Sequence, residues 1–168
     1  MTTTAGPVVR LYVPSDHGHL TPYLAALHAS CISHDRTIAT FIPPLNQEKL
    51  LNYWRRCIAE INAGTRLLLL LLDETEPGTK VKGSELMGCV MLHCPESETG
   101  RMRGFVEKLL VSPKFRKHGG ARLLMATLES EGLVRGKSLF VSESPQRAKP
   151  PSLPRRVSPL LTRPLIRW

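Results

Sequence analysis

The chain has 168 residues, of which 23 are Lys or Arg and 14 are Asp or Glu, giving a formal net charge of +9. A balance this basic raises the question of a nucleic-acid or acidic-surface partner. The longest unbroken apolar run, Leu67–Leu72, is far shorter than the roughly 18 residues that a membrane-spanning helix needs. Residues 1–20 also hold no apolar stretch of signal-peptide length. The sequence therefore excludes a membrane-spanning class, and we expect a cytoplasmic protein.

The positive charge is concentrated at one end of the chain. Residues 144–168 contain six of the basic residues, six of the 14 prolines and no acid, whereas residues 1–143 hold 17 basic and 14 acidic residues, a net of +3. Dense proline breaks helices and removes hydrogen-bond donors from sheets. We therefore predict a globular domain over residues 1–143 and a basic, disordered tail over 144–168. The tail has one aromatic residue, Trp168, and no recognition helix, so nucleic acid is not the expected main partner.

The first half of the chain predicts a strand, two helices and a buried strand. Val8–Val13 is β-branched and aromatic, and a helix is expected over Thr21–Ile32. Asn46 is a plausible N-cap for an amphipathic helix that stops at Gly64. The continuous apolar run in Arg66–Asp73 is typical of a strand covered on both faces.

The second half alternates strands with one helix. Strands are predicted over Leu86–Cys94, Arg103–Val111 and Ser138–Val141, and a helix runs from Gly119 to the region of 132–136. This order indicates an α/β (α+β) fold, in which a mixed central sheet is flanked by helices.

The four cysteines do not have the spacing of a zinc site. Cys89 and Cys94 would face opposite sides of one strand, and paired Cys-x-x-Cys ligands are absent. Buried free thiols are the simpler interpretation, and no metal is expected.

Chemistry is expected where the strand ending at Val111 passes through a basic, glycine-containing loop into a helix. A helix start exposes unpaired backbone N–H groups and the positive end of the helix dipole. Gly119 and Gly120 have no Cβ to block a close approach. Positive side chains surround the loop: Lys114, Arg116, Lys117, His118 and Arg122. The segment therefore suits a diphosphate, although neither the Walker A nor the dinucleotide-binding pattern is present.

The spacing Arg116-x-x-Gly119-x-Ala121 resembles motif A of the GNAT superfamily of acyl-CoA N-acyltransferases. Lys108–Pro113 occupies the place of the fourth GNAT strand, and Ala121–Glu129 that of the following helix. The upstream Pro-Pro-Leu loop and the Trp-containing helix are similar to small-molecule acetyltransferases of the tabtoxin-resistance type. The resemblance covers residues 8–141.

The resemblance implies an N-acetyltransferase that uses acetyl-CoA as donor and a small-molecule amine as acceptor. The N–H groups of residues 117–122 would bind the pyrophosphate of coenzyme A, and the strand before them would pair with its pantetheine arm. The implied cofactor-binding residues are Leu109, Leu110, Val111, Arg116, Lys117, His118, Gly119, Gly120, Ala121 and Arg122.

Glu107 is the candidate general base, because many members carry a carboxylate on this strand. The alternative is a structural ion pair with Arg66, Arg103 or Lys108. By family analogy, the acceptor pocket would be lined by Phe41, Pro43, Pro44 and Trp54. Core packing explains Trp54 equally well, and no role is assigned to the histidines at 17, 19, 28 and 34.

The chain departs from the family pattern after Glu143. The usual last helix and strand pair are replaced by the proline-rich tail, and no Tyr follows Tyr53 to act as the general acid. We interpret the tail as the product of a frameshift, a retained intron or altered splicing. An unpaired sheet edge would favour a homo-oligomer. Two alternatives to catalysis remain: a non-catalytic coenzyme A-binding protein, and a protein whose tail binds nucleic acid or an acidic surface.

Overall fold

The structure is a computed structural model that describes residues 6–36, 41–74 and 79–142. Its helices and strands follow in the order β1 (Val8–Leu11), α1 (Pro14–His17), η1 (Gly18–Leu20), α2 (Thr21–Asp35), α3 (Gln47–Asn62), β2 (Arg66–Leu72), η2 (Gly83–Glu85), β3 (Leu86–His93), η3 (Glu98–Gly100), β4 (Arg103–Val111), η4 (Pro113–Phe115), α4 (Gly120–Val134) and β5 (Leu139–Ser142).

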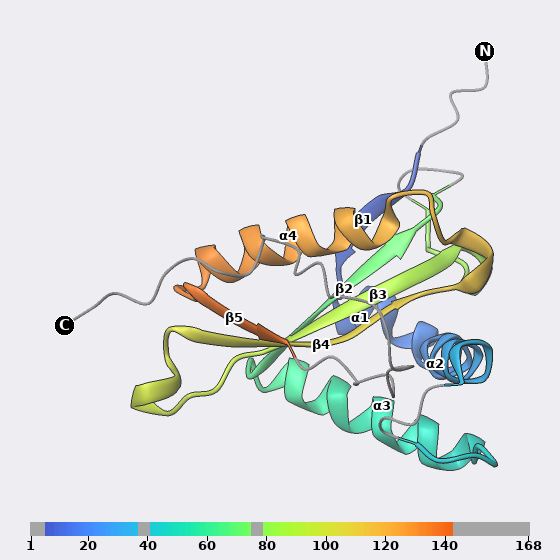
Figure 1. Cartoon of the computed structure of the whole chain (residues 1–168), viewed down its shortest axis with the longest axis horizontal. Coiled ribbons are helices and arrows are strands. Elements are labelled where there is room, and N and C mark those ends of the chain that lie inside the picture. Colours follow the sequence, from blue (N-terminus) through green and yellow to red (C-terminus); the bar gives the residue numbers. More distant parts are fainter. Residues whose placement is uncertain (1–5, 37–40, 75–78, 143–168) are drawn as a thin grey trace, which may run out of the picture.

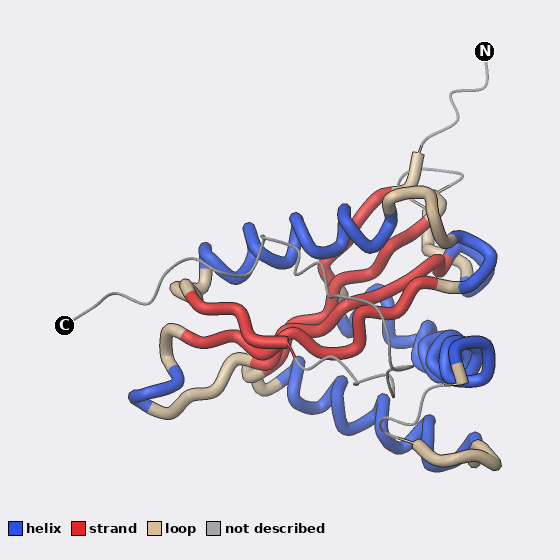
Figure 2. The backbone as a smooth tube through the Cα atoms, in the orientation of Figure 1, coloured by secondary structure: helices blue, strands red, loops and turns tan. Residues whose placement is uncertain are grey.

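The strands form one mixed sheet in the order β1-β2-β3-β4-β5. Strands β1 to β4 pair with one another in antiparallel fashion, and β5 runs parallel to β4. Helix α4 covers one face of the sheet, and α2 and α3 cover the other (Figure 1). The same three layers are visible in Figure 2, where the red strands lie between the blue helices. This arrangement confirms the predicted α/β class.

The leucine-rich strand β2 is buried on both faces, as its continuous apolar run predicts. Leu68, Leu70 and Leu72 belong to the core beneath α2 and α3. Leu67, Leu69 and Leu71 alternate with them and belong to the core beneath α4. A strand with one wet face would show polar residues at every second position, so the unbroken run follows from the three-layer packing.

The start of α3 was predicted correctly from local sequence, whereas the end of α2 was not. Asn46 caps α3 as predicted, because its side-chain oxygen accepts a hydrogen bond from the backbone N–H of Lys49 at 3.0 Å. Helix α2 continues to Asp35, beyond the predicted end near Ile32, and stops where Arg36 turns left-handed with φ of 50°. The longer helix brings Asp35 to the loop before α4, which the helical pattern alone did not reveal.

The predicted boundary at residues 143 and 144 and the predicted tail lie outside the described residues. The predicted replacement of the last helix and strand pair also falls outside the described residues. Strand β5 is the last described element, and it is one of the two edge strands of the described sheet, the other being β1. In the described part of the chain, no helix combines the length and the apolar character needed to cross a membrane.

Candidate functional site

The second half of β4 has an open edge. Strand β5 pairs with β4 only from Arg103 to Val106, so the described residues provide no strand partner there for positions 107–111 (Figure 1). The ladder between β3 and β4 is irregular between Cys89 and Met91, and Lys108 has a positive φ of 51° at this point. A bulge of this kind bends a strand and redirects its side chains.

Backbone alternation sets Leu109 and Val111 apart from Leu110. The N–H of Ser112 donates to the Met87 carbonyl of β3 at 2.8 Å, so Val111, one residue earlier, turns its backbone groups toward the open edge. The same alternation assigns Leu109 to that edge. Leu110 instead faces Cys89 in the β3 ladder and packs its side chain on the core beneath α2 and α3. Leu109 and Val111 thus face the open edge, whereas Leu110 faces β3.

The loop after β4 ends in two glycines that serve different purposes. Gly119 is the N-cap of α4 with φ of 81°, a conformation that glycine adopts without strain. Gly120 is buried, and a Cβ there would lie 2.5 Å from Cδ2 of Leu71. Gly119 therefore shapes the turn, whereas Gly120 lets the helix start close to β2.

The first turn of α4 leaves backbone donors free of helical partners. The first hydrogen bond from this turn back to the N-cap runs from the N–H of Leu123 to the carbonyl of Gly119, at 3.0 Å. The N–H groups of Gly120, Ala121 and Arg122 therefore have no carbonyl within the helix, and glycine at the N-cap has no side chain to accept from them. Together with the helix dipole, they form a site that suits an anion.

The basic side chains around this turn fall into two groups. Exposed side chains in the loop and the first turn of α4 are those of Lys114, Lys117, His118 and Arg122. Arg116 is different, because its guanidinium forms a two-pronged ion pair with Asp35 of α2 at 2.6 and 2.8 Å. Its Nε also donates to the Val111 carbonyl at 3.0 Å. The expectation that the Arg116 side chain adds free positive charge to the loop is thus corrected: that charge is balanced by Asp35.

Glu107 has the ion pair that the sequence offered as its structural alternative. Its Oε2 accepts from Nη1 of Arg66 at 2.5 Å, and Arg66 also binds Glu60 of α3 at 2.6 Å. Arg66 is thus a confirmed partner among the three that the sequence suggested. Glu107 remains partly exposed, with 37% of its side-chain surface accessible. The contact fixes one carboxylate oxygen and leaves the group within reach of solvent.

An aromatic cluster lies beside the bulge of β4. Ring centroids of Phe41, Tyr53 and Trp54 each lie 5.4 to 6.0 Å from that of His28. Nζ of Lys108 lies 5.6 Å from the centre of the Tyr53 ring. Trp54 is fully buried, as core packing predicts, and Phe41 is half-buried. Pro43 and Pro44 are exposed.

His28 was missed by the sequence reasoning. It is 4% exposed, and its Nδ1 has no hydrogen-bond partner in the described structure. Burial, followed by the charge of Lys108, lowers the pKa of His28 to about 4, so the ring is neutral at pH 7. Its spacing from Leu24 and Cys31, which share its helix face, was the available signal.

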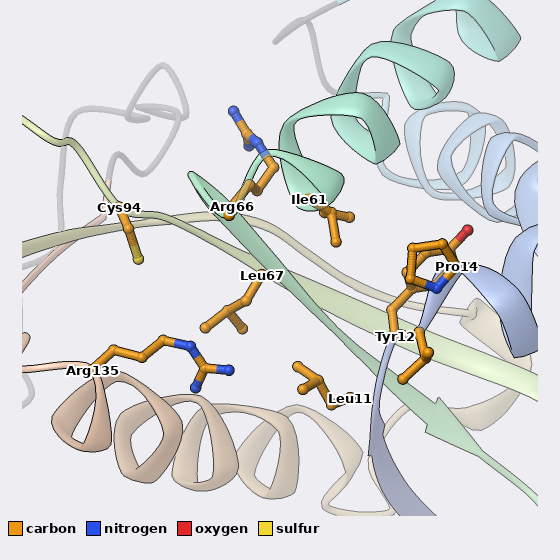
Figure 3. Close-up of a pocket in the computed structure, with 10 residues that line it drawn as sticks. Leu11, Tyr12, Pro14, Ile61, Arg66, Leu67, Cys94 and Arg135 are labelled. Carbon is orange, nitrogen blue, oxygen red and sulfur yellow. The ribbon is translucent and has the colours of Figure 1, made fainter.

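A separate pocket of about 250 Å³ lies at the other end of α4. Leu67, Cys94 and Arg135 point into it, whereas Arg66 points away toward α3 (Figure 3). Arg135 follows the last residue of α4, so about 20 Å of helix separates this pocket from the free N–H groups. Arg135 is already paired with Glu131. We therefore keep the candidate site at the β4–α4 loop.

No cluster of three metal-binding side chains is found within the described ranges. The described chain therefore offers donors for an anion, in the form of backbone N–H groups and exposed basic side chains. An open strand edge next to these donors can accommodate an extended ligand arm.

Solved structures share the fold of this chain. An aminoglycoside acetyltransferase from an uncultured soil metagenomic sample has a TM-score of 0.59 at 18% identity, covering 86% of this chain and 83% of its own. A ribosomal-protein-alanine N-acetyltransferase from Brucella melitensis biovar Abortus 2308 scores 0.55 at 20% identity, covering 84% and 82%. A predicted acetyltransferase from Clostridium acetobutylicum, solved with acetyl-CoA, scores 0.54 at 12% identity, covering 83% and 81%. At these identities the likeness shows the fold.

No curated protein sequence matches the chain significantly. A model of the acetyltransferase (GNAT) family matches residues 40–149, which include β4, its loop and α4. Because this match spans well over half of the 168 residues, the chain belongs to the acetyltransferase (GNAT) family.

Proposed function

We propose that this chain transfers the acetyl group of acetyl-CoA to an amine nitrogen of a small molecule. The observation that carries the proposal is the group of free N–H donors on Gly120, Ala121 and Arg122, next to the open edge of β4. The donors suit the diphosphate of coenzyme A, and the edge formed by Leu109 and the N–H of Val111 suits its amide-containing pantetheine arm.

The proposed reaction is direct attack of the amine on the thioester. A C–N bond forms at the carbonyl carbon, the C–S bond breaks, and the departing thiolate takes up a proton. The amine loses a proton to a base. A backbone N–H on the open edge of β4 stabilises the developing oxyanion. Positioning of the two reactants supplies much of the rate enhancement.

We propose Glu107 as the base, acting through a water molecule. Its partial exposure supports access by water, and Arg66 holds Oε2 and so orients the carboxylate. The structural alternative is that Glu107 only completes the ion-pair network of Arg66 and Glu60. The two roles differ in their effect on turnover.

Small amines are the proposed acceptors. The fold is similar to that of an aminoglycoside acetyltransferase, and the half-buried Phe41 beside the exposed Pro43 supports an acceptor surface near β4. The tabtoxin-resistance type is the proposed subfamily. The replaced C-terminus is a proposal that transcript and genomic sequence test, since a continuous frame with no family-like continuation nearby would contradict it.

The experiment combines a donor assay with product identification. The full chain is incubated with acetyl-CoA and a panel of aminoglycosides, aliphatic amines and a peptide with an N-terminal alanine. We expect free thiol and N-acetylated product in equal amounts for a small amine. Acetylation of the peptide alone would contradict the acceptor class. Binding of coenzyme A without any product would favour a non-catalytic coenzyme A protein. A salt-sensitive DNA complex lost on removing residues 144–168 would favour the binding alternative.

We also propose a cellular location and an oligomeric state. Cys31, Cys57, Cys89 and Cys94 are free thiols, which is typical of a reducing compartment, and we propose a cytoplasmic protein on that ground. The outer edge of β5 supports self-association. Sedimentation of the full chain over a range of concentrations tests it, and a monomer throughout would contradict it.

A further inference from the structure

The side chain of Arg116 joins three parts of the fold. Its two terminal nitrogens bind both carboxylate oxygens of Asp35, at the end of α2, at 2.6 and 2.8 Å. Its Nε donates to the carbonyl of Val111, at the end of β4, at 3.0 Å. The backbone of Arg116 belongs to the loop that leads to α4. One guanidinium thus ties this loop to a helix and a strand.

The other contacts at this point fit a fixed junction. Sγ of Cys31, one turn before Asp35 on α2, donates to the same Val111 carbonyl at 3.5 Å. Hydrogen bonding from Arg116 lowers the pKa of Asp35 to about 2, so its carboxylate is ionised at neutral pH. A planar guanidinium facing a carboxylate with two parallel bonds has a defined orientation, which an ammonium group would not impose.

The junction lies directly beside the part of the loop that needs support. Lys117 has a φ of 67° and Gly119 a φ of 81°. A left-handed conformation is unfavourable for a residue with a Cβ, so Lys117 holds it only because neighbouring structure fixes the chain. Arg116, the preceding residue, is the anchored one. These two left-handed residues lead into the free N–H groups at the start of α4.

We propose that Arg116 is a positioning residue for the diphosphate of coenzyme A: clamped by Asp35, it fixes the loop that aims the N–H groups of α4, and its side chain is not a phosphate ligand. The proposal rests on the proposed function, because it assigns how that site is held in shape. Direct positive charge at the site comes from the exposed Lys117 and Arg122.

The two possible roles of Arg116 predict opposite effects of Asp35→Asn. If the guanidinium were a phosphate ligand, the change would release it and remove a nearby negative charge, so coenzyme A would bind more tightly. If Arg116 positions the loop, the change weakens the clamp, and coenzyme A binds less tightly. Asp73→Asn is the matched control, because Asp73 is an exposed acid outside this junction.

The experiment is calorimetric titration of coenzyme A into the full chain, with a thermal melt of each variant without ligand. We expect at least fivefold weaker binding for Asp35→Asn, Arg116→Gln and Arg116→Lys, no further loss in the double variant Asp35→Asn/Arg116→Gln, and wild-type binding for Asp73→Asn. Asp35→Glu, which keeps the carboxylate, is expected to restore most of the affinity. If Asp35→Glu regains affinity for coenzyme A and the weakly binding variants melt at the wild-type temperature, the loss of affinity comes from positioning and not from a general loss of structure.

Different results would contradict the positioning role of Arg116 and the proposed function. If the wild type binds coenzyme A and Asp35→Asn binds it equally well or more tightly, the positioning role is overturned and the proposed function stands. Retained affinity in Arg116→Lys would indicate a phosphate ligand and overturn it as well. Failure of the wild-type chain to bind coenzyme A would overturn the proposed function and this assignment with it. If Asp35→Asn does not fold, Arg116→Lys decides the question alone.

Discussion

Glu107 is both the proposed general base and an ion-pair partner of Arg66. We predict that Glu107→Gln lowers turnover by about 10²- to 10³-fold, because amide nitrogen and oxygen cannot accept the amine proton. Glu60→Gln is the matched control, since Glu60 shares Arg66 with Glu107 from the far side. The measurement is acetyl transfer over a range of pH. Equal losses in both variants would assign Glu107 to the ion-pair network instead.

His28 links burial to the pH dependence of stability. Its pKa is about 4 in the folded chain and near 6.5 when unfolded, so the unfolded state binds more protons between these values and stability falls as the pH drops. We predict that His28 makes the free energy of unfolding about 2 kcal/mol smaller at pH 5 than at pH 7. Urea unfolding of the wild type and His28→Phe at both pH values measures this contribution.

His28→Phe should show a weaker pH dependence of stability than the wild type. An identical pH dependence in the two chains would show that His28 is not held neutral by burial.

At the scale of elements, the loop between β4 and α4 depends on one left-handed glycine. Gly119→Ala meets no atom within 4 Å, so its cost is backbone strain of about 1 to 2 kcal/mol. Gly64 has a φ of 80° and equally open surroundings, far from this loop in sequence. We predict similar losses of stability for Gly119→Ala and Gly64→Ala, and weaker coenzyme A binding for Gly119→Ala alone.

Urea unfolding and calorimetric titration of the two variants check this prediction. A loss of affinity in both chains would mean that strain acts through overall stability. Wild-type affinity in Gly119→Ala would mean that the loop shape is not needed by the ligand.

Local patterns predicted the elements that depend on neighbouring residues. The leucine run of β2, the Asn46 cap and the glycine start of α4 each have a short-range physical cause. Contacts between distant segments were harder to predict. Asp35 and Arg116 are 81 positions apart, and no helical or strand periodicity indicates their pairing.

Glu107 and His28 show the same limit at the candidate site. Opposite charge suggested three partners for Glu107, and its ion pair with Arg66 follows from the sheet order, which lets Arg66 reach across Met91 of β3. The position of His28 on a buried helix face could be predicted, but its aromatic neighbours come from α3 and the preceding loop. The motif Arg116-x-x-Gly119-x-Ala121 could be identified from the sequence because its residues are close together in the chain.

At the scale of the whole molecule, the sheet topology brings the parts of the site together. Strand β5 leaves one edge of the second half of β4 without a strand partner among the described residues, and α4 starts beyond the end of that half. The charge is also unevenly distributed. Residues 1–143 carry a net charge of +3, and exposed basic residues occur in the loop and first turn of α4. The charge of residues 1–143 therefore supports a phosphate-containing ligand more than a nucleic-acid surface.

Hydrogen–deuterium exchange of the full chain, with and without saturating coenzyme A, tests the location of the acyl-CoA site most directly. Bound ligand should occupy the N–H groups at the open edge of β4 and the first turn of α4. We predict slower exchange in peptides covering residues 107–123, and a smaller effect in Gly119→Ala at the same ligand concentration. Unchanged exchange in that segment, or protection confined to the pocket around Leu67, Cys94 and Arg135, would contradict the account.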